Sequence, residues 1–336
     1  MSFLRWVTLI LCACGCAMAA PVKLIIDTDY DSDVDDVAAL SLAHAYADAG
    51  EAEILGVAVV GLHETCAPAV QSQNAFYGRT EIPIGVRRSG GGPLVGSAYT
   101  KTLVEKFPAA FDRVAAPEPV ALYRKLLAGA DDQSVVIVSF GHLSNLADLL
   151  DSEADAFSPL GGIELVRKKV LHYVCMGSEY PKQLKPGTWG NFLPDPKAVI
   201  RVNNDWPTPI IYTGGGAFAR KVNLGSAFLE LPETSLVRQA YEVFFKNTSW
   251  AKGPDHHTAD PIAIYVAVKG VGPYFKETKG GHCHVFENGT MEWRPSPSDP
   301  NRSYVADLAD ESQGEAAAAK FEELIVAADR KRLEKR

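Results

Sequence analysis

The sequence predicts an α/β fold with a mainly parallel central sheet and helices on both faces. Three observations lead to this fold class. Short apolar runs of the kind that form buried parallel strands recur along the chain. Segments with helical character separate these runs, as the crossovers of a parallel sheet require. Acidic or glycine-containing loops follow several of the runs, and open α/β sheets bind ligands at that edge.

The chain is organised around an apolar run at 24–26, the acidic loop that follows it, and a helix that begins near 37. The loop holds six aspartates within ten residues: Asp27, Asp29, Asp31, Asp33, Asp35 and Asp36. Two unit charges at 4 Å repel by about 1 kcal/mol in water and about 4 kcal/mol at an effective dielectric of 20. The loop therefore needs a cation, proton uptake or exposure to solvent. Its ligands are all hard oxygens, which favour Ca²⁺ or Mg²⁺ over Zn²⁺.

Two other interpretations of this loop are open. It could be a solvated acidic turn in which Asp35 and Asp36 only favour the start of the helix. It could also be an EF-hand, since its first three aspartates alternate correctly. An EF-hand, however, needs a glycine where Ser32 stands and a bidentate acid where Ala38 stands. A buried strand that points its carboxyl end at a metal is the better interpretation.

The remaining elements follow from the apolar pattern. Further strands are expected at 53–60, 82–86, 134–139, 169–175 and 209–212, because each run is short and apolar. Helices are expected from the acidic loop through 46, at 67–77, at 118–127, from the turn at 141–145 through 150, and at 316–335. The glycine-rich loop at 89–93 lacks the Gly-Lys-Ser/Thr sequence of a phosphate-binding loop. No repeat or linker interrupts the pattern, so we predict one domain over 20–336.

Composition bounds the class of partner. The 336 residues are 47% hydrophobic and 22% charged, values that suit a globular chain with a sizeable core. The net charge is −8, and the only basic cluster lies in the C-terminal tail. These values argue against nucleic acid as a partner. Outside the first twenty residues three cysteines remain, an odd number that implies no disulfide framework.

The N-terminus resembles a secretory signal over residues 1–19. Arg5 supplies the positive start, 7–13 the apolar centre, and 17–19 a small-x-small cleavage site. This apolar stretch is too short to span a bilayer. We therefore expect export to the periplasm or the exterior after cleavage near Ala19. We expect no membrane attachment, unless Cys14 or Cys16 carries a lipid anchor.

The acidic loop also resembles the first motif of the nucleoside hydrolases of the inosine-uridine preferring type. That motif reads D-T-D, a spacer, then D-D and a helix of small residues. The matching aspartates are Asp27, Asp29, Asp35 and Asp36. The spacer at 30–34 is longer than the Pro-Gly-x of the commonest family form. Asp31 and Asp33 lie in this extra length, and the resemblance gives them no role.

A second stretch, at 141–145, follows an expected strand and resembles the family's G-x-L-T/S-N turn. In the family, the residue before this turn gives the metal its backbone carbonyl. Phe140 holds that position, and a change of side chain is tolerable where the carbonyl is the ligand. Ser144 or Asn145 could also cap the helix that follows, with or without a metal at Phe140.

A third stretch, at 189–196, resembles the family's E-x-N-x-x-x-D-P segment. Asn191 matches the asparagine that grips a ribose hydroxyl. Trp189 replaces the glutamate that holds the far end of the sugar. Tryptophan can stack on a ring but cannot accept a hydrogen bond from a hydroxyl. Taken alone, the stretch also suits a plain turn before a helix.

A fourth stretch, at 259–261, resembles the family's H-D-P turn. Asp260 matches the aspartate that binds the metal, although alone it would suit an N-cap. Ala259 replaces the histidine that often protonates the leaving base. His256 or His257 lies close by in sequence and could substitute, but surface histidines are the plainer interpretation.

The resemblance implies a calcium-dependent hydrolase that cleaves the N-glycosidic bond of a ribonucleoside or related N-riboside to a free base and ribose. Such bonds break through an oxocarbenium-like state, so the site must hold the sugar diol and deliver water. The implied ligands of Ca²⁺ are Asp29, Asp36, the Phe140 carbonyl and Asp260. The implied substrate contacts are Asp35, Asn191 and Trp189. Asp29 is also the implied general base, and Asp27 orients the other carboxylates.

Two rival functions stay open at this stage. A degenerate relative could bind a ribosyl ligand without turnover, and the replacements at Trp189 and Ala259 favour it. A phosphatase could use Asp27 and Asp29 as nucleophile and acid, although no downstream lysine stands in a clear strand-end context to grip phosphate. A small-molecule riboside is the expected partner in the leading interpretation, and a homo-oligomer is left open.

Overall fold

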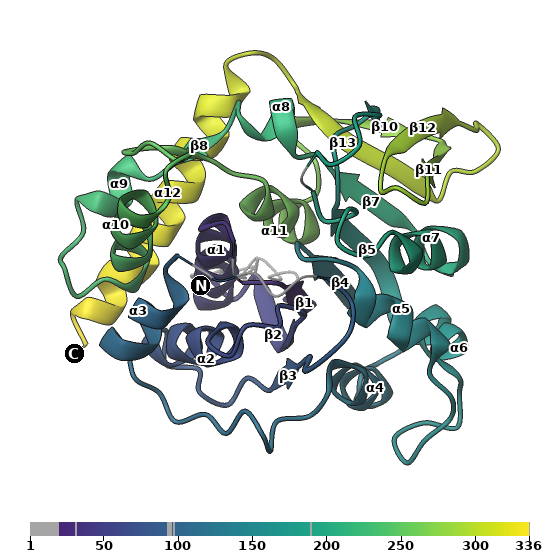
Figure 1. The fold of residues 1–336 in the computed structure, drawn as a ribbon, viewed down its shortest axis with the longest axis horizontal. Helices are drawn as coiled ribbons and strands as arrows, with labels where there is room; N and C mark the ends of the chain where they lie inside the picture. The colour runs from purple at the N-terminus through teal and green to yellow at the C-terminus, as the bar shows by residue number, and fades with distance from the viewer. Residues whose placement is uncertain (1–19, 31, 93–95, 97, 189, 336) are drawn as a thin grey trace, which may run out of the picture.

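The computed structural model describes residues 20–30, 32–92, 96, 98–188 and 190–335. The expected signal segment at 1–19 lies outside these residues, as do Asp31 and Trp189. An eight-stranded sheet runs through the molecule, with helices on both faces (Figure 1). The predicted fold class is therefore confirmed. No helix among the described residues is long and apolar enough to cross a membrane.

The sheet is parallel except at one edge. Its strands, in spatial order, are β10 (Phe275–Lys279), β13 (Arg302–Leu308), β7 (Ile210–Thr213), β5 (Val170–Met176), β4 (Val135–Ser139), β1 (Val22–Thr28), β2 (Ala52–Val59) and β3 (Ile84–Val86). Only the β10–β13 pair is antiparallel. β1 lies between β2 and β4 and pairs with both in parallel. The acidic loop after β1 therefore opens near the middle of the sheet edge.

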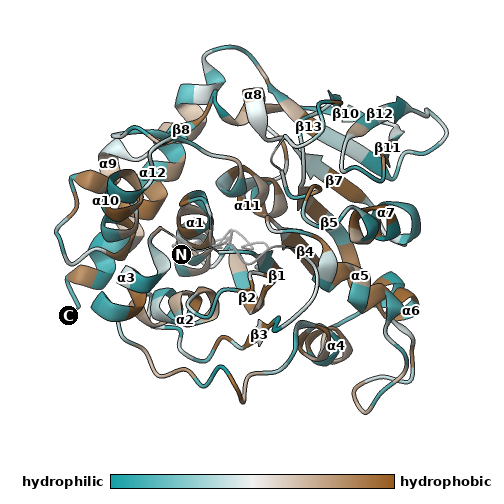
Figure 2. Ribbon diagram, viewed as in Figure 1, coloured by the Kyte–Doolittle hydropathy of each residue, from teal (hydrophilic) through white to brown (hydrophobic). Residues whose placement is uncertain are grey.

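Alternate residues of the central strands enter two separate cores. Leu24 and Ile26 of β1 pack in one core, and Ile25 between them packs in the other. The first core includes α1 (Asp35–Asp48), α2 (Cys66–Phe76), α10 (Leu236–Asn247), α11 (Asp260–Lys269) and α12 (Gln313–Leu333). The second includes α4 (Pro119–Gly129), α5 (Ser144–Asp151), α6 (Gly162–Lys169) and α7 (Pro196–Asp205). Figure 2 shows hydrophobic colours on the central strands and more hydrophilic colours on α7 and α12.

The helix α1 is the element that carries the acidic loop into the interior. Every residue from Asp35 to Tyr46 is buried, and most are alanine, leucine or valine. A helix that is apolar all round belongs inside a protein. α1 packs against both α11 and α12. Its first turn and that of α11 therefore come together at the sheet edge.

Several elements were not predicted, including β10 and β13 of the central sheet and the helices α6 and α10. β11 (Gly281–Val285), β12 (Met291–Pro295) and β6 (Lys182–Gln183) form a second sheet, and β8 (Asn223–Leu224) pairs with β9 (His256–His257). The short helices α3 (Thr100–Lys106), α8 (Gly216–Ala219) and α9 (Ser226–Leu229) complete the chain. β11 alternates buried and half-buried residues, so it lacks the continuous apolar run of a central strand.

Candidate active site

A cavity of about 550 Å³ opens at the carboxyl ends of the parallel strands. Its wall takes residues from the loop after each of four strands: Asp29 after β1, Phe140 after β4, Gly177 after β5 and Gly215 after β7. Ligands of open α/β sheets bind at this edge. The strand-end loops that the sequence marked therefore meet in one place.

The backbone of Asp29 is enclosed by two glycines. A Cβ at Gly61, just beyond β2, would lie 2.0 Å from the Asp29 carbonyl oxygen. A Cβ at Gly141, just beyond β4, would lie 2.6 Å from the Asp29 backbone nitrogen. Tyr30 follows in the left-handed region at φ 51, which is uncommon for an aromatic residue. These contacts fix the direction in which the chain leaves β1.

Three buried aspartates, which we name the carboxylate cluster, stand beside this turn. Asp35, Asp36 and Asp260 each have a carboxylate oxygen within 4.8 Å of one another. Asp35 and Asp36 begin α1, and Asp260 begins α11. Asp35 and Asp36 are only 4% and 1% exposed, so the interpretation of a solvated turn is wrong. Asp260 is the first residue of its helix and makes no capping hydrogen bond, so the alternative N-cap role is also wrong.

Hydrogen bonds hold the cluster in place. Asp35 Oδ2 accepts hydrogen bonds from the backbone N–H groups of Ala259 at 2.8 Å and Asp260 at 3.2 Å. Asp36 Oδ1 accepts from the Thr28 hydroxyl and from the Tyr30 backbone N–H, the latter at 3.2 Å. One oxygen of each aspartate is thereby fixed. A carboxylate has about four lone-pair sites, so Asp35 can accept a further ligand.

The negative charges of the carboxylate cluster repel one another. Burial, followed by the charges of Asp35, Asp36, Asp29 and Asp33, raises the pKa of Asp260 well above its usual range. Burial, followed by the Asp33 charge, raises the pKa of Asp35 to about 7, against the lowering effect of the Ala259 N–H. A cation among these oxygens would relieve both effects. A donor set made only of carboxylate and carbonyl oxygens fits a hard divalent ion such as Ca²⁺ or Mg²⁺.

Asp27 lies behind the cluster and is fully buried. Its Oδ2 accepts hydrogen bonds from the Tyr123 hydroxyl at 2.8 Å and the Asn145 amide at 3.0 Å. Its Oδ1 is buried without a hydrogen-bond partner among the described residues, which also suits a nearby cation. Burial, opposed by these two hydrogen bonds, raises the pKa of Asp27 to about 7.

The turn after β4 does not cap its helix. Asn145 points its amide at Asp27, and the Ser144 hydroxyl donates to Asp195 at 2.7 Å. No side-chain hydrogen bond caps α5, so the capping alternative for Ser144 and Asn145 is wrong. Asp195 instead caps α7 through the Ala198 N–H, as expected of a turn before a helix. The Phe140 N–H donates to the Asp27 carbonyl at 2.9 Å, which places Phe140 on the cavity wall.

Asn191 faces the cavity from the loop after β5. Its Nδ2 donates to the Met176 carbonyl at 3.1 Å, and its backbone N–H donates to the Gly177 carbonyl at 2.9 Å. The side-chain oxygen therefore remains as an acceptor for a ligand hydroxyl. Trp189 lies outside the described residues, although its neighbours Thr188 and Gly190 line the cavity.

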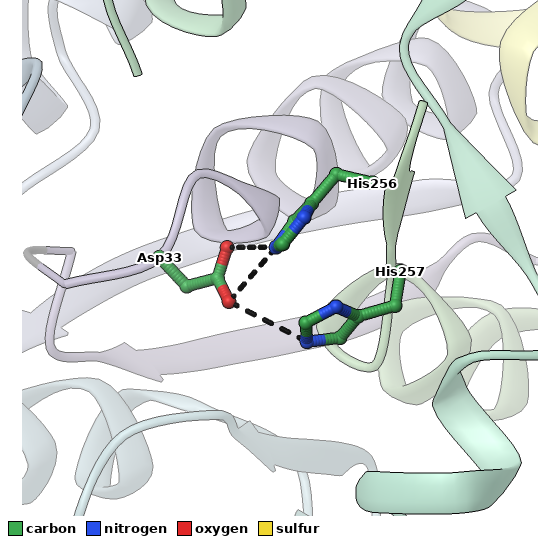
Figure 3. Close-up of side chains that lie close together, drawn as sticks. All are labelled: Asp33, His256 and His257. Carbon is green, nitrogen blue, oxygen red and sulfur yellow. Dashed lines mark hydrogen bonds and ion pairs between the residues drawn. The ribbon is translucent and has the colours of Figure 1, made fainter. Parts of the chain in front are cut away.

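A second group, which we name the Asp–His cluster, comprises Asp33, His256 and His257 (Figure 3). His256 Nε2 lies 2.9 Å from Asp33 Oδ1, and His257 Nε2 lies 3.7 Å from Asp33 Oδ2. Asp33 and His257 line the cavity. His256 is buried against Phe244, so the expectation of a surface residue is wrong for this histidine. Asp33 thus reaches histidines that follow it by more than two hundred residues.

Other cavity residues were missed by sequence reasoning. They include Ser178, Glu179, Gly216, Arg220 and Trp250. The glycine-containing ends of β5 and β7 were the available signal for the first three. Glu179 packs on Gly216, where a Cβ would fall 1.8 Å from the Glu179 Oε1. Arg220 and Trp250 follow no motif, and Trp250 is 60% exposed at the cavity.

The fold and the site together define a class. A parallel sheet whose carboxyl edge holds buried carboxylates beside a large cavity is typical of an enzyme of α/β fold that uses a divalent cation. The model of the inosine-uridine preferring nucleoside hydrolase family matches residues 24–319. The chain therefore belongs to this family of N-glycosyl hydrolases, and the phosphatase interpretation does not hold.

Solved structures show the same fold. A plant nucleoside hydrolase is 16% identical, with a TM-score of 0.67 over 91% of this chain and 99% of its own. An inosine-uridine preferring nucleoside hydrolase from Bacillus anthracis is 16% identical, with a TM-score of 0.66 over 92% and 99%. The type III effector protein XopQ, complexed with adenosine diphosphate ribose, is 16% identical, with a TM-score of 0.67 over 93% and 95%. A search of curated protein sequences finds no match to the chain.

Proposed function

We propose that this protein is a calcium-dependent hydrolase of ribonucleosides or related N-ribosides. The observation that carries the proposal is the carboxylate cluster at the wall of a cavity of about 550 Å³. Asp29, Asp36, Asp260 and the Phe140 carbonyl would hold the ion. When bound, Ca²⁺ supplies positive charge that binds the sugar diol and water and lowers the pKa of that water.

The sugar would be held by the acceptors that the loops leave free. Asp35 is anchored through one oxygen by the start of α11, which fixes the direction of its carboxylate. Asn191 is anchored through its Nδ2, which leaves its Oδ1 for a second hydroxyl. Two fixed acceptors can hold a vicinal diol in one orientation, and fixed orientation is a major source of rate enhancement.

The reaction needs a base for water and a route for the leaving group. Asp29 would take one proton from a water molecule while the water oxygen attacks the anomeric carbon. The carbon–nitrogen bond breaks, its electron pair goes to the leaving nucleobase, and the nucleobase gains a proton. Ala259 cannot give that proton. Substrates whose nucleobase leaves without protonation by the protein are therefore favoured. The degenerate binder remains the alternative, because Ala259 and Trp189 stand where the family has a histidine and a glutamate.

The substrate panel should include phosphorylated ribosides. XopQ, whose fold this chain shares, was solved with adenosine diphosphate ribose. Here Arg220 gives the cavity wall a positive charge among several acids. A phosphate could bind Arg220 while the ribose meets the carboxylate cluster. We also propose that the mature protein acts after export, supported by the signal-like segment at 1–19.

A release assay for ribose tests the proposal. The mature protein is incubated with inosine, uridine, adenosine, their phosphates and adenosine diphosphate ribose, with Ca²⁺ or with a chelator. We expect release of the free base, together with ribose or its phosphorylated form, from at least one substrate, and loss of this release in chelator. If the protein binds a riboside and releases no sugar from any of them, it is the degenerate binder.

A further inference from the structure

We propose that Asp33, His256 and His257 form a second metal site, which takes a borderline transition ion of the zinc class. Three ligand atoms from these residues lie within 4.8 Å of one another, separate from the carboxylate cluster. Imidazole nitrogen suits zinc, copper, iron and nickel, whereas an all-oxygen set suits calcium and magnesium. The two clusters therefore differ in the ion that they select. This inference does not depend on the proposed hydrolase activity.

The two histidines converge although their positions in the chain favour divergence. His256 and His257 are consecutive residues of β9, and consecutive strand residues normally point to opposite faces. Here their ring centroids are only 4.1 Å apart, and both Nε2 atoms face the Asp33 carboxylate (Figure 3). Convergence of this kind brings two ring nitrogens to one carboxylate.

A hydrogen bond to Asp33 explains the position of the His256 ring but not that of the His257 ring. His256 Nε2 lies within hydrogen-bond distance of both Asp33 oxygens, at 2.9 and 3.2 Å. His257 Nε2 lies 3.7 Å from Oδ2, which is too far for a hydrogen bond. The position of His257 Nε2 therefore needs another explanation, and a metal ion shared with Asp33 supplies one.

The spacing of the three ligand atoms suits a small ion. Zn²⁺ binds nitrogen at about 2.0–2.1 Å and carboxylate oxygen at about 2.0–2.2 Å, so tetrahedral ligands lie about 3.3 Å apart. Asp33 Oδ2 lies 3.2 Å from His256 Nε2 and 3.7 Å from His257 Nε2, close to this value. Small side-chain rotations would equalise them. Asp33 and His257 line the cavity, which leaves the fourth position open to water or ligand.

The surroundings hold the ligands in position. The Tyr99 hydroxyl donates to the Asp33 carbonyl at 2.7 Å, and the Val34 N–H donates to Asp33 Oδ1 at 2.7 Å. His256 packs edge-on against Phe244, with ring centroids 5.0 Å apart. β9 is paired with β8. Supporting contacts of this kind orient metal ligands and are needed for affinity.

Metal titration of the mature protein tests the site. Co²⁺ and Zn²⁺ are added to chelator-treated protein in excess Ca²⁺, so that the carboxylate cluster is already filled. We expect one equivalent to bind by calorimetry. The bound Co²⁺ should show the stronger visible absorption of a four-coordinate nitrogen–oxygen site. His257→Ala should weaken binding by at least about 100-fold, since loss of supporting contacts alone costs about 10–100-fold.

The controls separate this site from generic metal binding. His257 has a side chain 33% exposed, so its replacement by alanine should leave the fold intact, as a melting curve in Ca²⁺ would check. His282→Ala, at a half-buried histidine of β11, should leave Zn²⁺ affinity unchanged. Asp33→Asn should weaken binding as His257→Ala does. The proposal is overturned if wild-type protein binds no Zn²⁺ in excess Ca²⁺, or if His257→Ala and His282→Ala bind it equally.

Discussion

The carboxylate cluster and the Asp–His cluster arise from the same short loop and have different chemistry. The family-like positions of the loop place Asp35 and Asp36 against Asp260, in a buried set of oxygens that repel one another. The extra spacer length places Asp33 against two histidines, one of them 2.9 Å away. A loop longer than the usual family spacer has thus added a second group of ligands beside the first. One cluster offers only oxygen atoms, and the other adds two imidazole nitrogens.

The comparison predicts the largest effect on turnover at Asp29, which is a proposed ligand of the Ca²⁺ site and takes no part in the Asp–His cluster. Asp29→Asn should lower turnover by at least about 10²-fold, the usual contribution of a general base. Loss of a metal ligand would deepen the effect, while substrate affinity should fall less because Asp35 and Asn191 remain. Steady-state kinetics with Asp131→Asn, an exposed ion-pair residue, as control would check this. Equal turnover in the two variants would remove Asp29 from the mechanism.

Removal of Ca²⁺ should destabilise the protein through the carboxylate cluster. A ligand that binds only the folded state stabilises it by about 2.7 kcal/mol at 100 times its Kd. Thermal melts of wild type and Asp260→Asn, each with Ca²⁺ and with chelator, measure the effect. Wild type should gain stability from Ca²⁺, whereas Asp260→Asn should gain little. In chelator the variant should melt above wild type, because it lacks one of the repelling carboxylates. A variant that melts lower in chelator would refute the repulsion.

The stability of the metal-free protein should also depend on pH, because the buried carboxylates resist ionisation. Burial, with the Asp33 charge acting on Asp35, raises the pKa of Asp27 and of Asp35 from 3.8 to about 7. The folded state therefore holds protons that the unfolded state has lost. Stability from this source is complete below about pH 4 and falls as the pH rises through 7. Melts between pH 4.5 and 7.5 should show this fall in chelator and a smaller one in Ca²⁺. Parallel curves in the two conditions would contradict the account.

Replacement of Asn191 should weaken sugar binding, with a smaller effect than the changes above. Asn191→Ala removes one hydrogen bond, so ribose affinity should weaken by roughly 1–3 kcal/mol while turnover of bound substrate changes less. Asn204→Ala, at an exposed position of α7, is the matched control. Calorimetry with ribose in Ca²⁺ measures the difference. Equal affinity in the two variants would place the sugar elsewhere in the cavity.

The smallest expected effect is at Trp189. If its ring stacks on the substrate, Trp189→Ala should weaken riboside binding by about 1 kcal/mol, the scale of one aromatic contact. Trp189→Glu should shift preference toward ordinary nucleosides, because it restores an acceptor for a sugar hydroxyl. Competition binding of inosine and adenosine diphosphate ribose compares the variants. Identical preference in all three forms would show that position 189 does not touch the ligand.

The apolar pattern predicted the six neighbouring strands from β7 to β3 for simple physical reasons, whereas the convergence of Asp36 with Asp260 followed from the family resemblance. Buried parallel strands need continuous apolar runs, and their carboxyl ends meet at one edge. The same reasoning could not find the partners of Asp33, because His256 follows it by 223 residues in no recognisable ligand spacing. Arg220 and Trp250 reach the cavity through the packing of whole loops. β11 and β12 were missed because half-buried strands lack a continuous apolar run.

The central claim is that the carboxylate cluster must hold Ca²⁺ for an N-riboside to be cleaved. The most direct measurement compares ribose release with Ca²⁺ binding on one sample, as free Ca²⁺ is raised from chelated to saturating levels. The account predicts that release rises from background to a plateau, with the same midpoint as the calorimetric binding curve, and that Asp36→Asn lacks both. Release at an unchanged rate in chelator, from protein shown to be free of metal, would contradict it.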